Sequence, residues 1–148
     1  MEHQSPKAIL VVSFGTSYEA SRKATIEIIE QDIADAFPDY RIYHAWTSKF
    51  IISVLKKRDG ISIPTMCEAI EQMIHDGIRS LIVQPTHILD GIENNVMKEA
   101  VLSYKDSFDQ IVFGAPLLAA SDDETHAIAA VTSEFKNLKA TDALVLMG

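Results

Sequence analysis

The sequence predicts an α/β fold, a three-layer α/β sandwich with a parallel sheet, and three observations lead to that prediction. Short apolar runs alternate with amphipathic stretches along the chain, which is the pattern of repeated βα units. The first run, residues 8–13, is apolar on both faces, as a central parallel strand should be. A length of 148 residues with 47% hydrophobic residues is enough for a buried core. We therefore expect residues 8–13 to lie inside the sheet.

The first helix is predicted over about residues 18–37. Gly15 ends the preceding strand, and Pro38 stops the helix because proline cannot continue it. The second strand is predicted over residues 41–45. The apolar residues of the helix are spaced three, four and four positions apart on one face, and they are Ile26, Ile29, Ile33 and Phe37.

Two capped helices are predicted after the second strand. Thr47 or Ser48 can cap the first of them, because a hydroxyl at this position accepts a hydrogen bond from the first turn. Thr65 and Glu68 have the spacing of a capping box and predict the start of the second. A third strand follows over residues 81–84.

A polar loop is predicted over residues 85–95, directly after the third strand. A helix then continues to about residue 107, and residues 111–113 form the fourth strand. Because the strands alternate with helices, each loop that follows a strand should reach the same edge of the sheet.

The C-terminal stretch predicts one more helix and a fifth strand, at residues 143–147. Ser121 and Glu124 have capping-box spacing. We expect residues 1–140 to form one α/β domain and residues 141–148 to begin the first strand of a second domain, because a buried parallel strand rarely ends a domain. The helix presents apolar residues at spacings of three, four and three, namely Ile128, Val131, Phe135 and Leu138.

Charge and cysteine content exclude several classes of partner and site. The formal net charge of −8 argues against nucleic acid, whose phosphates bind basic surfaces, and against an anionic membrane surface. Cys67 is the only cysteine, so no intrachain disulfide or cysteine-based zinc site can form. The apolar run at residues 8–12 is too short for a signal peptide or a membrane span, and the cytoplasm is the expected compartment.

The loops after the strands hold the candidate ligand-binding residues, because open α/β sheets bind ligands beyond the carboxyl ends of their strands. Gly15 lets the backbone approach a ligand closely, and hydroxyls beside a helix start favour an anion. Capping of that helix by Ser17 explains the same residues equally well. Trp46 can stack on a planar ligand or belong to a hydrophobic cluster. The expected substrate-binding residues are Phe14, Gly15, Thr16, Ser17, Trp46, Thr47, Ser48, Pro116 and Leu117.

His87 and Glu93 are the predicted catalytic residues. Both lie in the loop after the third strand, and imidazole and carboxylate are the usual proton acceptors in general-base catalysis. They are also common ligands of divalent first-row metals. A structural role for His87, and a first-turn helix acid at Glu93 that the helix dipole favours, are the alternatives.

Five blocks of the sequence resemble the anaerobic cobalt chelatases, also called sirohydrochlorin cobaltochelatases. The likeness spans nearly the whole chain, in order and at natural spacing. The blocks are residues 9–18 (ILVVSFGTSY), 45–48 (AWTS) with 55–61 (LKKRDGI), 84–93 (QPTHILDGIE), 114–118 (GAPLL) and 144–148 (LVLMG).

The resemblance implies a class II chelatase fold of the kind shared with ferrochelatase. Such proteins have two similar α/β domains, each with a four-stranded parallel sheet, and bind a tetrapyrrole between them. The implied substrates are sirohydrochlorin or precorrin-2 and Co²⁺, with no tightly bound cofactor, and a homo-oligomer is left open. The family's first metal histidine would follow Gly148, so no metal ligand is assigned in this chain. We expect a fragment that lacks the main metal ligands and is inactive alone.

Two other functions fit the same sequence. A flavodoxin-like electron carrier suits the length and acidity, with Trp46 stacking on a flavin, although the loop at Thr16 has fewer hydroxyls than a phosphate site of that kind needs. A non-catalytic tetrapyrrole-binding module is the second alternative. A bound flavin would absorb near 450 nm, roughly, and make the protein yellow, because that colour belongs to the cofactor.

Overall fold

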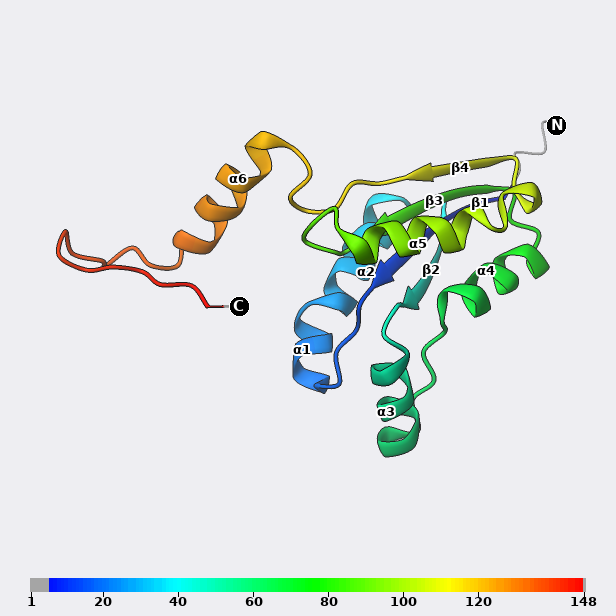
Figure 1. Ribbon diagram of the computed structural model, residues 1–148, viewed down its shortest axis with the longest axis horizontal. Helices are drawn as coiled ribbons and strands as arrows, with labels where there is room; N and C mark the ends of the chain where they lie inside the picture. Colours follow the sequence, from blue (N-terminus) through cyan, green and yellow to red (C-terminus); the bar gives the residue numbers. More distant parts are fainter. Residues whose placement is uncertain (1–5, 148) are drawn as a thin grey trace.

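Four apolar segments form one parallel sheet in the computed structural model, which describes residues 6–147 (Figure 1). Each neighbouring pair of strands is parallel, and the spatial order is β2-β1-β3-β4. Val11 in β1 lies opposite His44 on one side and Gln84 on the other. The prediction of a parallel sheet with the first strand inside it is confirmed. The strands are β1 (Lys7–Ser13), β2 (Arg41–Trp46), β3 (Ser80–Pro85) and β4 (Gln110–Phe113).

Local signals fix the starts of two helices as predicted. The Ser48 hydroxyl accepts a hydrogen bond from the Ile51 N–H at 3.3 Å and caps α3. The capping box of Thr65 and Glu68 begins α4. The helices are α1 (Glu19–Ala24), α2 (Ile26–Ala36), α3 (Lys49–Asp59), α4 (Met66–His75), α5 (Ile92–Leu102) and α6 (Ser121–Thr132), with a 3-10 turn at Lys105–Ser107.

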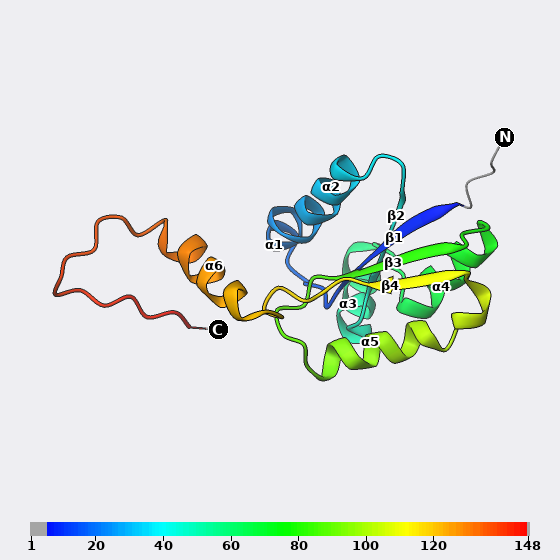
Figure 2. The same ribbon diagram turned by 90° about the horizontal axis from the view of Figure 1, so that it is seen from above.

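Helices cover both faces of the sheet and produce the predicted three layers. Figure 2 shows α1 and α2 on one face and α4 and α5 on the other. The main core lies between the sheet and the second pair, where side chains of β1 and β3 meet the apolar stripes of α4 and α5. Its centre is at most 1% exposed and includes Leu10, Ile70, Met73, Val83 and Met97.

The first predicted helix is wrong in one respect, because two helices replace it. Thr25 separates α1 from α2 with φ −128° and ψ −78°. Its hydroxyl donates to the Ser21 carbonyl oxygen at 2.6 Å, and a β-branched residue that bonds back to this carbonyl can bend a helix. The periodicity of apolar residues did not reveal this break, since it depends on the backbone angles of a single residue.

The C-terminal prediction needs three corrections. Helix α6 ends at Thr132, so Phe135 and Leu138 of the predicted apolar face lie outside it. At the start of α6 the capping acid is Asp123, whose Oδ2 accepts from the Ala119 and Ala120 N–H groups at 3.0 and 2.7 Å, so Ser121 and Glu124 do not form the box. Residues 143–147 form no strand, so the described sheet has four strands and not five. An extended segment becomes a strand only beside a partner, and this segment lies away from the sheet (Figure 1). The boundary of a second domain stays a prediction.

Candidate functional site

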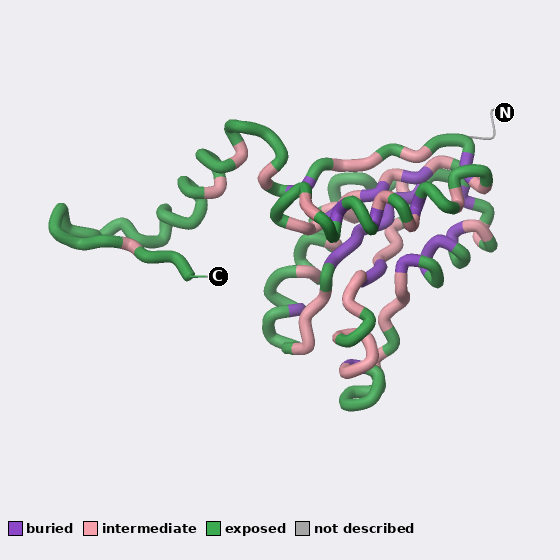
Figure 3. Tube along the Cα trace, in the orientation of Figure 1, coloured by how far each residue is buried: buried purple, intermediate pink, exposed green. Residues whose placement is uncertain are grey.

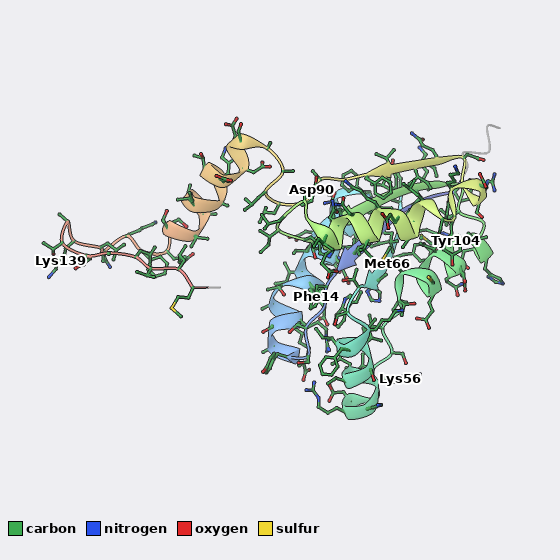
Figure 4. All side chains as sticks on the ribbon, in the orientation of Figure 1. Phe14, Lys56, Met66, Asp90, Tyr104 and Lys139 are labelled. Atoms are coloured by element: carbon green, nitrogen blue, oxygen red, sulfur yellow. The ribbon has the colours of Figure 1, made fainter. Side chains whose placement is uncertain are left out.

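The loops that follow the four strands meet at one edge of the sheet, as predicted. Main-chain hydrogen bonds join neighbouring loops, because parallel strands all end at the same edge. Thr47 N–H donates to the Ser13 carbonyl at 2.9 Å, and Leu117 N–H donates to the His87 carbonyl at 3.1 Å. In Figure 4, Phe14 and Asp90 lie toward this edge, and Tyr104 lies toward the opposite end of the sheet.

A cavity of about 790 Å³ opens at this edge. The loop after β1 contributes Phe14 and Thr16, and the loop after β3 contributes His87, with Glu93 at the start of α5. The structure therefore brings both predicted catalytic residues to the same cavity as part of the predicted substrate-binding set. The other lining residues are Ser13, Gly15, Ser21, Thr25, Ile26, Thr86, Ile88, Leu89, Gly91 and Ile92.

A second cavity, of about 610 Å³, shares Thr86 and His87 with the first. Pro116 and Leu117 line this second cavity, together with Ile29 and Ile33 of α2 among others. His87 thus stands between two hollows, and the predicted contacts at Pro116 and Leu117 belong to the second one.

His87 is half-buried, and neither of its ring nitrogens has a hydrogen-bond partner among residues 6–147. The residue is partly accessible and unpaired, although both nitrogens are themselves shielded from solvent. Burial lowers the pKa of His87 below its ordinary value, and the nearby Glu93 opposes that shift only in part. The imidazole is therefore neutral near pH 7 and able to accept a proton.

The site also contains two hydroxyl groups that the sequence analysis did not single out. The Thr86 hydroxyl donates to the Ser13 oxygen at 2.8 Å and links the ends of β3 and β1. Ser13 is 1% exposed and lines the first cavity. A signal was present, because Ser13 is polar and directly follows the apolar residues 8–12 at the carboxyl end of β1.

Trp46 is part of the scaffold and lines neither cavity described above. It is 2% exposed, and its ring lies directly under Gly15. A Cβ at Gly15 would come within 2.5 Å of the Trp46 Cε3 atom, and Gly15 has φ +109°. The glycine therefore permits a close approach of the indole. Gly15 also lines the first cavity, and its contact with a ligand stays a prediction.

The remaining predicted residues, Ser17, Thr47 and Ser48, do not line the two cavities. Ser48 caps α3. Ser17 does not cap α1, whose N-cap is Tyr18 without a side-chain cap, so the capping alternative for Ser17 is wrong. The first turn of α1 also carries Glu19, whose charge opposes the predicted anion site.

Neither a metal centre nor a membrane segment stands out in the described chain. Between residues 6 and 147 no group of three or more His, Cys, Asp or Glu side chains is arranged to hold a metal ion. Every helix in the same range falls short of the length and apolar character that spanning a bilayer requires.

Comparisons with known proteins agree with the resemblance seen in the sequence. A family model described as cobalt chelatase (CbiK) matches residues 7–148. A sirohydrochlorin cobaltochelatase of Salmonella typhimurium is 34% identical over 142 residues, which cover 96% of this chain and 54% of that protein. Sirohydrochlorin cobaltochelatase CbiKC of Nitratidesulfovibrio vulgaris is 27% identical over 149 residues, which cover 96% of this chain and 51% of that protein. The chain spans about half the length of the curated relatives it matches.

Proposed function

Because this chain belongs to the cobalt chelatase (CbiK) family, we propose that it forms one wall of a sirohydrochlorin cobaltochelatase. The proposed reaction inserts Co²⁺, a substrate, into sirohydrochlorin or precorrin-2 as a lyase-class step of anaerobic cobalamin biosynthesis. One observation carries the proposal for the site. His87 stands in the wall of two cavities with both ring nitrogens free of hydrogen-bond partners among the described residues.

Insertion of Co²⁺ releases two pyrrole N–H protons, so the reaction needs a proton acceptor near the ring nitrogens. The lowered pKa keeps the His87 imidazole neutral, and a neutral imidazole accepts a proton from a pyrrole N–H. Glu93 lines the same cavity and is exposed, so its carboxylate can relay the proton to water. Both protons leave to solvent as the metal enters, and no electrons are transferred.

The part assigned to this chain is to hold and orient the macrocycle. Exposed apolar side chains at the cavity, Phe14 and Ile92 among them, suit contact with a flat tetrapyrrole face. Because the described residues offer no group of three metal ligands, we expect the isolated chain to bind sirohydrochlorin without inserting cobalt. A cytoplasmic location and assembly into a homo-oligomer stay predictions.

The test is His87→Ala in the complete protein that contains this chain. Loss of the proton acceptor should lower kcat/KM for cobalt insertion at least about tenfold, or about 1.4 kcal/mol of transition-state stabilisation. Stability in urea should change little. His75→Ala is the matched control, because the His75 side chain is 85% exposed and lies on α4, away from both cavities. An unchanged insertion rate with a lowered melting temperature would show that His87 has a structural role and not a catalytic one.

A non-catalytic tetrapyrrole-binding module is the second candidate, and the metal-ligand finding above favours it for the isolated chain. Insertion by the complete protein separates this candidate from the chelatase. The flavin carrier loses its main support, because Trp46 is buried beneath Gly15 and cannot stack on a ring.

A further inference from the structure

Asn94 is a fully buried polar side chain in the first turns of α5, with 0% exposure. A buried amide is costly unless it forms hydrogen bonds. Its Nδ2 donates to Asp90 Oδ1 at 2.6 Å, while its Oδ1 has no partner within the described residues. A side chain that is retained in the interior with one of its polar atoms unsatisfied needs an explanation, and its one hydrogen bond points to the loop after β3.

Asp90 depends on Asn94 for its short side-chain contact. Lys98 is the other charged neighbour, but its Nζ lies 3.8 Å from Asp90 Oδ1, which is too long for a hydrogen bond. The amide donates to an ionised carboxylate, and charge-assisted bonds of this kind are stronger than neutral ones. The Asp90 side chain is 54% exposed, so without Asn94 nothing comparable would hold it against α5.

The loop from His87 to Gly91 is held on its other side by main-chain bonds. The N–H groups of Leu117 and Leu118 donate to the carbonyls of His87 and Ile88 at 3.1 and 2.8 Å. Ile88, Leu89 and Asp90 are themselves exposed, so packing contributes little to their order. The loop therefore has two anchors, one at the β4 side and one at Asn94.

We propose that Asn94 is a positioning residue, which holds the loop through Asp90 and so fixes His87 at the cavity wall. The inference rests on the proposed function, since His87, the residue that Asn94 would position, is the proposed proton acceptor of that site. Asn94 lines neither of the two cavities. Its effect on the substrate is indirect.

Asn94→Asp tests this with minimal change of shape, because a carboxylate replaces the donating amide and repels Asp90. Asn95→Asp is the matched control, since Asn95 is the next residue of α5 and is exposed. We expect amide hydrogen exchange of residues 88–91 to accelerate about tenfold in Asn94→Asp, the effect of losing about 1.4 kcal/mol of local stability. The NMR titration of the His87 ring should shift, and sirohydrochlorin binding to the chain should weaken about threefold or more.

A double variant that exchanges the Asp90 and Asn94 side chains should restore the hydrogen bond between the two positions. In Asp90→Asn with Asn94→Asp, the amide stands on the loop and the carboxylate on the helix, so loop exchange and the His87 titration should return toward wild type. If Asn94→Asp fails to fold, Asp90→Ala gives the same answer, because it removes the bond from the exposed partner.

Unchanged loop exchange and an unchanged His87 titration in Asn94→Asp, or in Asp90→Ala, would overturn the proposal. Equal sirohydrochlorin binding by wild type and by a variant with a released loop would also overturn it. If wild type does not bind sirohydrochlorin at all, the proposed function fails, and the loop measurements still decide whether Asn94 positions His87.

Discussion

Helices α4 and α6 begin in a similar way but have opposite surroundings. Each begins with a side-chain cap. Only Ile128 and Val131 of the apolar face predicted for α6 lie within the helix, because α6 ends at Thr132. Four residues of α4 are buried, Met66, Ala69, Ile70 and Met73, whereas α6 has no buried residue. Figure 3 shows the contrast, with buried residues in β1, β3 and α4 and an exposed C-terminal segment that projects from the sheet. A capped segment can form a helix without being buried, whereas burial requires an apolar face and a second apolar surface within reach.

The largest expected effect separates two isoleucines. Ile70 is 0% exposed and Ile128 is 62% exposed, and both become alanine. Ile70→Ala should lower the free energy of unfolding by about 2–5 kcal/mol, because it leaves a cavity in the core. Ile128→Ala should change it by less than about 0.5 kcal/mol. Urea unfolding of both variants checks this, and equal losses would show that α6 is buried in solution.

The next largest effect is expected at Gly15, which packs closely against Trp46 at the edge of the sheet. Gly15 and Gly77 both have positive φ, +109° and +77°, but only Gly15 meets a neighbour, Trp46, where a Cβ would stand. Gly77→Ala should cost about 1 kcal/mol from backbone strain alone. Gly15→Ala should cost about 1–3 kcal/mol more, because the methyl group must displace the indole. Thermal unfolding of both compares them, and equal costs would contradict the close contact.

A smaller effect distinguishes the two helix caps. Thr65→Ala removes the cap of α4 and should lower global stability by about 1 kcal/mol, because α4 unfolds only with the core. Asp123→Ala removes the cap of α6 and should increase amide exchange within α6 while the melting temperature stays the same. A lower melting temperature in Asp123→Ala would mean that α6 shares the cooperative unit of the sheet.

The smallest effect concerns an ion pair between a strand and a helix. His44 in β2 lies 3.1 Å from Glu30 in α2. The hydrogen bond to Glu30 raises the pKa of His44, and partial burial opposes that rise. The stabilisation of the fold by this ion pair is therefore complete below the unfolded pKa of His44, 6.5, and is lost as pH rises through the higher folded pKa.

With the His44 side chain 41% exposed, we expect no more than about 0.5 kcal/mol from this pair. Glu30→Gln should remove the pH-dependent part, which urea unfolding between pH 5 and 8, roughly the range in which histidine titrates, can detect. A stabilisation that grows with pH would reverse the assigned sign.

Parts of the candidate site were predictable because they follow from chain topology. His87 and Glu93 come after a buried strand, and parallel strands bring such loops to one edge, so their shared cavity was expected. Asn94 was not predictable, because nothing in its sequence neighbourhood distinguishes a buried asparagine from the exposed Asn95 beside it. Its role depends on the direction in which one turn of α5 faces.

The sequence by itself determined the parallel sheet, the central place of β1, the capping box of α4 and the family, because apolar periodicity, cap spacing and motif order are local and readable along the chain. Only the tertiary structure decided that Trp46 packs under Gly15, that Thr25 divides the first helix, and that residues 143–147 form no strand. The first and the third depend on which surface lies next to a residue in space, and the second depends on the backbone angles of one residue. The spacing of apolar residues along the sequence shows which residues lie on the same face of a helix or strand. It does not show which surface that face packs against.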